Sequence, residues 1–358
     1  ISKRSIESIN IYKGGKSSID NNKKIIKLSS NENPYGPSPK INEILQSKDF
    51  LTKLHRYPEI DGSSLRQAIS KYHSIDPDRI ILGSGSDEIL LFAALAFCQD
   101  GDEILHANHG FEMYSIVSKV VGAVPKKIKE DENFNLNIEN LINQTNEATK
   151  VIYIASPNNP TGTYLSRDKL VKLMNSISKN IVVVIDGAYV EYVQKDDYDK
   201  GFSLTDEYEN IILTRTFSKT YGLAALRVGW CYSSKKITDI INKIKPPFNT
   251  TTISQSLAIK ALEDKEHIEN SVKLNSEIKN WFEKELKLLN IKTRQTEGNF
   301  TLIETSEEEA EKISNHLMNE GIIIRRLNSY NLPNFLRISI GTKEEMDLTV
   351  ESLKKLNV

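Results

Sequence analysis

The chain contains little of what marks secreted or membrane proteins. Its two cysteines among 358 residues, Cys98 and Cys231, lie far apart inside apolar segments. This spacing excludes a disulfide framework and favours a reducing, cytoplasmic compartment. No apolar run approaches the roughly 20 residues that a membrane-spanning helix requires, and the N-terminal segment is polar, without the apolar core of a signal peptide. We therefore expect no membrane partner.

Charge and histidine content argue against two further classes. The net charge is -1, which gives no electrostatic reason to expect a nucleic acid partner. Of the six histidines, His106 and His109 lie close together, but no cysteine or carboxylate cluster joins them, so no metal site is expected. With 39% hydrophobic and 27% charged residues the composition is that of a globular protein, and the length predicts about two domains.

From residue 80 onward, short apolar runs alternate with amphipathic segments. β-Branched residues in the apolar runs favour strands, whereas apolar residues three to four positions apart favour helices. We predict strands at 80–82, 103–106, 151–155, 181–185 and 211–214, and helices at 87–97 and 166–177. Strands separated by helical crossovers predict a mostly parallel α/β sheet flanked by helices.

The pattern changes after Pro246 and Pro247, which a helix interior would not tolerate. An α+β unit follows, with helices predicted at about 253–289, 306–320 and 343–355, and short strands within 291–304, 322–326 and 335–340. We predict a small domain at 249–358 and a large domain at 31–248, whose first part contributes to the small domain or to a dimer contact. Residues 1–30 are predicted to form an arm that lies on a neighbour.

Lys219 stands in the most informative segment of the chain. It follows an apolar run and lies in a short turn with the hydroxyl groups of Thr216, Ser218 and Thr220, a few residues before Arg227. A lysine at the end of a strand, with hydroxyls and an arginine nearby, suits an enzyme that forms a Schiff base with a phosphate-bearing cofactor.

The segment Gly83–Glu88 follows the first predicted strand and opens a helix. Backbone amides at a helix N-terminus favour a phosphate, and glycine allows a close approach. The alternative is that Ser86 and Asp87 merely cap the helix. The segment fits a dinucleotide-binding fingerprint poorly, because Glu88 occupies the place of the third glycine. A nicotinamide-dependent oxidoreductase, the rival class that rests on these glycines, would also leave Lys219 without a role.

Other polar residues interrupt or end apolar strands. Asp186 ends one strand, with Tyr189 three residues later, at the edge where open α/β sheets bind ligands; a solvated acid is the alternative. Asn159 either shapes a turn or donates its amide to a ligand. Arg337 and Arg325, on two C-terminal strands, are either surface residues or planar groups that bind an anion.

Together and in this order, these motifs resemble those of fold type I pyridoxal-phosphate enzymes of the class I/II aminotransferase group. The resemblance extends over nearly the whole chain, and it is greatest to the histidinol-phosphate aminotransferase family. The motifs that carry it include Leu28–Pro37, His55–Pro58, Asn158–Gly162 and Leu336–Thr342. It implies a large domain with a mostly parallel sheet, a smaller α+β domain, and a homodimer with shared active sites.

The resemblance also implies which residues hold pyridoxal 5'-phosphate. Lys219 would form the Schiff base, Asp186 would keep the ring nitrogen protonated, and Tyr189 and Asn159 would bind the 3-oxygen of the ring. Phe111 would stack on the ring. The cofactor phosphate would be bound by Ser86, Asp87, Thr216, Ser218 and Arg227 and, from the other subunit, by Tyr57. The catalytic residues would be Lys219, Asp186 and Tyr189.

The implied substrate residues are Tyr12, Asn33, Arg325 and Arg337. Histidinol phosphate has no α-carboxylate, whereas glutamate has one, so Arg337 would serve the glutamate half of the reaction. Tyr12 and Arg325 would serve the phosphate of the other substrate. The implied reaction moves the amino group of histidinol phosphate to 2-oxoglutarate, a step of histidine biosynthesis. An aromatic amino acid aminotransferase or a threonine-phosphate decarboxylase of the same fold is the alternative, and a purely binding or scaffold role would make these residues coincidental.

Two positions depart from the family's pattern. His109-Gly110-Phe111 stands where the family usually has Pro-Thr followed by an aromatic residue, so the stacking ring is kept but its turn is altered. Arg326 follows Arg325 where a proline or an acid is more usual. Arg326 is therefore expected to add a charge near the substrate phosphate.

Overall fold

The computed structural model describes residues 2–12, 14–16, 18, 25–47 and 49–356. Its centre is a seven-stranded sheet in the order β2-β8-β7-β6-β5-β3-β4. All neighbouring strands from β7 to β4 are parallel, and β8 is antiparallel to both its neighbours. The predicted, mostly parallel sheet is confirmed. Its strands are β2 (Ile80–Gly83), β3 (Glu103–Ala107), β4 (Val124–Ile128), β5 (Thr149–Ala155), β6 (Val182–Asp186), β7 (Ile211–Thr216) and β8 (Gly229–Ser233).

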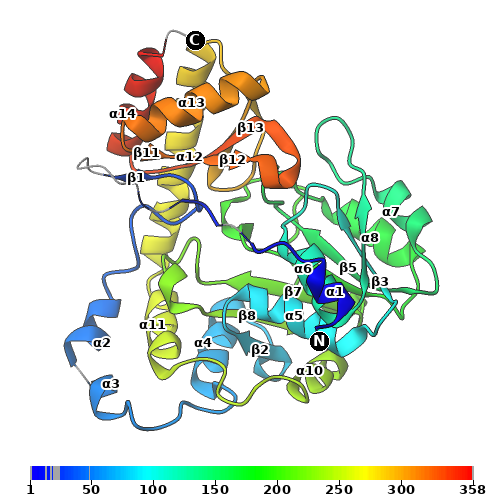
Figure 1. Cartoon of the computed structure of the whole chain (residues 1–358). Helices are drawn as coiled ribbons and strands as arrows, with labels where there is room; N and C mark the ends of the chain where they lie inside the picture. Colours follow the sequence, from blue (N-terminus) through cyan, green and yellow to red (C-terminus); the bar gives the residue numbers. More distant parts are fainter. Residues whose placement is uncertain (1, 13, 17, 19–24, 48, 357–358) are drawn as a thin grey trace.

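Helices cover both faces of this sheet (Figure 1). Strand β6 shows why both faces are apolar: Val182 and Val184 pack into one buried cluster and Val183 and Ile185 into the other, because successive strand side chains alternate. The first cluster includes α5 (Ser86–Phe97), α6 (Met113–Val121) and α10 (Lys235–Asn242). The second includes α4 (Ser63–His73), α7 (Ile138–Gln144), α8 (Arg167–Ser176), α9 (Leu204–Glu207) and α11 (Thr252–Leu262).

A second, antiparallel sheet has the order β12-β13-β10-β9 and lies beside the first (Figure 1). On strand β13, Leu336 and Ile338 pack against the helices of this unit, whereas Phe335 belongs to a different cluster on the other face. The strands are β9 (Lys292–Arg294), β10 (Phe300–Glu304), β12 (Arg325–Leu327) and β13 (Leu332–Ser339), and the helices are α12 (Lys265–Leu288), α13 (Glu307–Asn319) and α14 (Lys343–Lys354).

The predicted elements are found with small changes at their ends, except in two places. The single helix predicted at 253–289 is wrong: α11 ends at Leu262, and Asp264 begins α12 by accepting a hydrogen bond from the backbone N of His267 (3.2 Å). The strand predicted at 322–326 is two short strands, β11 (Ile322–Ile323) and β12. The division of the chain at residue 248 stays a prediction.

The described part of the N-terminal arm lies on its own chain. Helix α1 (Arg4–Glu7) contacts α6, and the Nζ of Lys119 donates to the carbonyl of Ser8 (3.0 Å). Strand β1 (Ile26–Lys27) pairs in parallel with β11. The predicted contact of this arm with a neighbouring subunit stays a prediction, and residues 1, 13, 17 and 19–24 of the arm lie outside the described part.

Several short segments complete the description. They are α2 (Ile41–Ser47), α3 (Asp49–Thr52) and 3-10 turns at Pro77–Arg79, Val190–Tyr192, Ala224–Leu226 and Asn328–Tyr330. Within the described ranges, no helix has the length and apolar character needed to cross a membrane. Cys98 and Cys231 are both free thiols.

Candidate active site

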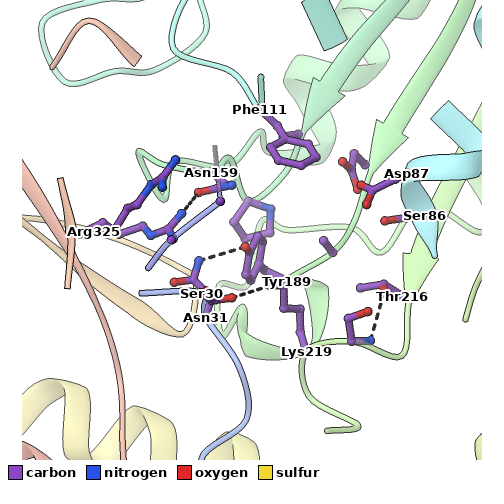
Figure 2. A pocket seen from close by; sticks show the side chains of 18 of the residues that line it. Ser30, Asn31, Ser86, Asp87, Phe111, Asn159, Tyr189, Thr216, Lys219 and Arg325 are labelled. Carbon is purple, nitrogen blue, oxygen red and sulfur yellow. Dashed lines mark hydrogen bonds between the residues drawn. The ribbon is translucent and has the colours of Figure 1, made fainter. Parts of the chain in front are cut away.

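A cavity lies where the carboxyl ends of β6 and β7 meet the four-stranded sheet (Figure 2). Residues from nearly the whole length of the chain line it, from Tyr12 to Arg337. Of the predicted site residues, all except Asn33 and Tyr57 are among them. Those that line it are Tyr12, Ser86, Asp87, Phe111, Asn159, Asp186, Tyr189, Thr216, Ser218, Lys219, Arg227, Arg325 and Arg337.

Lys219 reaches into the cavity from the turn after β7 (Figure 2). Its Nζ donates a hydrogen bond to the backbone carbonyl of Ser30 (2.9 Å) and lies 5.6 Å from the centre of the Tyr189 ring. A carbonyl oxygen accepts a hydrogen bond from the amine but carries no charge, so it does not form an ion pair with it. The amine is thus oriented by a neutral partner, as a reactive lysine requires.

Asp186 ends β6 and is 6% exposed. Burial raises the pKa of its carboxyl, against the hydrogen bonds that the hydroxyls of Tyr114 (2.8 Å) and Thr214 (2.9 Å) donate to it. Burial disfavours the lone anion, and a cation placed beside it would relieve that cost. The carboxylate therefore suits a protonated ring nitrogen in the cavity.

An anion site lies at the N-terminus of α5. The helix begins after Gly85, which has φ +80° and offers no capping side chain, so the first backbone N–H groups of the helix are left for a ligand. A Cβ at Gly85 would lie 2.4 Å from Nη2 of Arg227. Nη1 of Arg227 donates to the hydroxyl of Ser218 (3.3 Å), and Nη2 pairs with Asp87 (3.3 Å). Amides, a hydroxyl and a guanidinium therefore converge as a phosphate requires.

Arg337 of β13 lines the cavity from the side of the four-stranded sheet and is 5% exposed. Its guanidinium donates to the side-chain oxygen of Asn159 and to the carbonyl of Ser29 (2.8 Å), while its Nε has no partner. Burial lowers the pKa of Arg337, but its ordinary value is so high that the group stays charged. A buried guanidinium with an unpaired donor beside a cavity is suited to a carboxylate.

Tyr189 is fixed by a residue from the N-terminal part of the chain. Asn31 donates its side-chain amide to the Tyr189 hydroxyl (3.0 Å; Figure 2). The side-chain oxygen of Asn31 accepts from the hydroxyl of Ser339 (2.8 Å). The phenol of Tyr189 thus keeps its proton free to donate into the cavity.

Tyr12, Phe111 and Tyr330 form an aromatic edge of the cavity near Arg325. The rings of Tyr12 and Phe111 meet edge to face at 6.3 Å. Burial raises the pKa of Tyr12, although Arg325 acts in the opposite direction, so its hydroxyl is a neutral donor. Burial likewise raises the pKa of Tyr330.

Asn33 and Tyr57 lie outside the cavity. The amide of Asn33 donates to the carbonyl of Thr220 (2.7 Å) and to the hydroxyl of Ser271 (3.2 Å), and so supports the turn next to Lys219 instead of facing the cavity. Tyr57 is 81% exposed and stacks on Phe248 at 4.5 Å.

Arg326 corrects a sequence expectation. It pairs with Glu311 of α13 (3.4 Å) and does not line the cavity, because neighbouring residues of a strand point to opposite faces. The expectation that Arg326 adds a charge beside the substrate phosphate is therefore wrong.

Sequence reasoning missed Ser30, Asn31, Tyr114 and Tyr330, which also line the cavity. Asn31 lies inside the Leu28–Pro37 motif, so that motif could have indicated that Asn31 belongs to the site. Tyr114 lies three residues after Phe111 at the start of α6, but only the tertiary fold brings its hydroxyl to Asp186. Among the described residues, no group of three or more His, Cys, Asp or Glu could hold a metal ion.

A mostly parallel sheet with a lysine, a buried acid and an anion site at its carboxyl edge defines a fold type I aminotransferase. Residues 23–353 match the family described as aminotransferase class I and II, and the chain belongs to this family. It is 40% identical to the histidinol-phosphate aminotransferase of Dinoroseobacter shibae, over 97% of this chain and 95% of the relative. It is 42% identical to that of Pelagibacter ubique, over 94% of each.

A solved structure shares the fold. The histidinol-phosphate aminotransferase from Sinorhizobium meliloti, in complex with pyridoxal-5'-phosphate, superposes with a TM-score of 0.87 at 24% identity, over 93% of this chain and 91% of that one.

Proposed function

We propose that this chain transfers the amino group of histidinol phosphate to 2-oxoglutarate, with pyridoxal 5'-phosphate bound at Lys219. The observation that carries the substrate choice is the presence of two guanidinium groups in one cavity, Arg337 on β13 and Arg325 beside Tyr12. One suits the carboxylate of glutamate, and the other suits a phosphate. The names of the relatives at 40% and 42% identity support the same substrate.

The residues of the cavity fit the cofactor. The uncapped N-terminus of α5, with Ser218 and Arg227, suits the cofactor phosphate, and Asp186 suits the ring nitrogen. Phe111 lines the cavity where it can cover the ring, and Tyr189 and Asn159 can donate to the ring oxygen. When bound, pyridoxal 5'-phosphate supplies an electron sink for the carbanion at the α-carbon of the substrate.

Lys219 acts as the base. Its amine, oriented by the Ser30 carbonyl, would take the proton from the α-carbon of the substrate and deliver it to the carbon of the cofactor that carries the amino group. With a protonated ring nitrogen beside it, Asp186 would keep its negative charge, and the hydroxyls of Tyr114 and Thr214 would hold the carboxylate in place. The turn of Thr220, supported by Asn33, keeps Lys219 in place.

The enzyme acts as a cytoplasmic homodimer in this proposal. The exposed Tyr57 stacks on the partly buried Phe248, which supports a contact with a second subunit, where Tyr57 would reach the cofactor phosphate. The two free thiols support a reducing compartment. Sedimentation equilibrium tests the assembly, because a monomer with full activity would contradict it. Within each subunit, 31–248 binds the cofactor and 249–358 forms the small domain.

The substrate is tested by single-turnover half-reactions that follow the absorbance of the bound cofactor. Histidinol phosphate is expected to react with a much higher kcat/KM than phenylalanine or tyrosine. The reverse preference would establish an aromatic aminotransferase, and release of carbon dioxide from threonine phosphate would establish the decarboxylase.

The role of Arg325 has a matched control on the same strand. Arg325→Ala is expected to lower kcat/KM for histidinol phosphate by about 10- to 100-fold, the loss of a charge-assisted hydrogen bond, and to leave glutamate nearly unchanged. Arg326→Ala is expected to change neither, because Arg326 faces Glu311. Equal losses for both substrates in Arg325→Ala would contradict its assignment to the phosphate.

A further inference from the structure

Phe134 lies in the loop after β4, and its ring packs against the four-stranded sheet. The ring meets Phe335 of β13 edge to face, with 5.3 Å between centres, and packs against the apolar cluster of Leu302, Leu327, Tyr330, Leu332 and Phe335. The ring thus fills an apolar recess of the four-stranded sheet, although its backbone belongs to the seven-stranded unit.

The backbone of Phe134 is bound to the turn that carries Asn159. The Thr163 hydroxyl donates to the carbonyl of Phe134 (3.0 Å) and lies 3.1 Å from the Thr161 hydroxyl. Asn158 donates its amide to that Thr161 hydroxyl (2.7 Å) and to the carbonyl of His109 (3.0 Å). A continuous chain of hydrogen bonds therefore connects Phe134 to Asn158, next to Asn159, and to His109, two residues before Phe111.

His109 completes this support. Its ring meets Phe134 edge to face at 5.4 Å, and its backbone N and Nδ1 both bond to the buried carboxylate of Glu130 (2.7 and 3.2 Å). The turn before Phe111 is therefore fixed to the Phe134 loop by the backbone and the imidazole of His109.

The conformation of the loop is strongly specified. Asp131 accepts hydrogen bonds from the backbone N of Asn133 and of Asn135 (2.8 Å each), and Phe134 has φ +63°, a left-handed conformation that a bulky residue rarely adopts. Such strain is kept only where surrounding contacts compensate for it. On the other side, Arg294 of β9 donates to Asn133 (3.1 Å).

Phe335 and Arg337 are two residues apart on β13 and so face the same side of the sheet. The position of Phe335 against Phe134 therefore sets how far Arg337 stands from Asn159. We propose that Phe134 is a positioning residue, a spacer that fixes Arg337 relative to the cofactor cavity, with His109 and Glu130 as its support. This inference rests on the proposed use of Arg337 for the carboxylate substrate.

Phe134→Ala in the cofactor-loaded enzyme tests the spacer, with the exposed Glu132→Ala as control. The KM for glutamate is expected to rise about 5- to 10-fold, of the order expected when a bound group is misplaced, while the affinity for pyridoxal 5'-phosphate stays within about twofold. Phe134→Leu, which refills part of the recess, is expected to recover most of the loss.

Hydrogen–deuterium exchange gives a readout that does not depend on activity. Phe134→Ala is expected to speed exchange of the amides of β13 severalfold and to leave β7 unchanged. Faster exchange of β13 with an unchanged KM for glutamate would show that the Phe134 contact only packs the two units together, and would overturn the proposal. Wild-type values of both the exchange rates and the KM would also overturn it. If the unaltered enzyme fails to transaminate glutamate, the proposed function fails, and the exchange data still decide whether Phe134 holds β13.

Discussion

At the scale of single residues, burial has different consequences for different charged or titratable groups. Asp186 and Arg337 are both nearly buried, yet each faces the cavity with hydrogen bonds that fix it and capacity left for a ligand. His73 does not line the cavity and lies among the rings of Tyr72, Phe202 and Trp230. Its burial has consequences for folding instead of for catalysis.

His73 should make the protein less stable in acid. Burial, aided by Arg215 and Lys200, lowers its pKa from 6.5 to about 3. Between pH 6.5 and about 3, His73 is protonated in the unfolded chain but neutral in the folded chain. The free energy of unfolding therefore falls as pH drops below 6.5, by at most about 1.4 kcal/mol per pH unit. His73→Phe is expected to make this fall shallower. Urea unfolding from pH 7 to 4.5 measures it, and an unchanged slope would show that His73 is protonated in the fold.

At the scale of elements, the turn after β5 joins the two sheets. The backbone N of Glu297 donates to the carbonyl of Gly162 (2.8 Å), and Arg337 bonds to Asn159 in the same turn. Gly162 has φ +78°, and a Cβ there would lie 2.4 Å from the Cβ of Thr296. The sequence did not show that this segment contacts the second sheet, because its partners there lie more than a hundred residues away.

Gly162→Ala is expected to destabilise the fold by about 2–4 kcal/mol, through left-handed strain and a clash with Thr296. Gly101→Ala is the matched control, since Gly101 has φ +85° but nothing within 4 Å of an added Cβ. Gly101→Ala should lower the free energy of unfolding only through the left-handed strain, by about 1 kcal/mol. Denaturant midpoints compare the two variants, and equal losses would mean that the Thr296 contact contributes nothing.

The sequence predicted the buried strands well and the later elements less well. Runs such as Val182–Ile185 are apolar on both faces, so they indicate a central parallel strand without further information. The break between α11 and α12 depends on Asp264 acting as a cap. A single acid within a helical pattern does not reveal whether it caps a new helix or faces solvent.

At the scale of the whole molecule, the cavity joins residues that no local pattern connects. Asn31 near the N-terminus bonds to Tyr189 and to Ser339 near the C-terminus. The resemblance of ordered motifs predicted most of this set. It could not separate Arg325 from Arg326, because only the placement of β12 decides which side chain faces the cavity.

The central claim is that Lys219 holds pyridoxal 5'-phosphate at this cavity. The direct test is borohydride reduction of the cofactor-loaded protein, followed by peptide mass spectrometry. The cofactor mass is expected on the peptide that contains Lys219 and is expected to be lost in Lys219→Ala. A label on Lys279, a partly buried lysine that donates to the carbonyl of Thr296 (2.5 Å), or a label that persists in Lys219→Ala, would contradict the account.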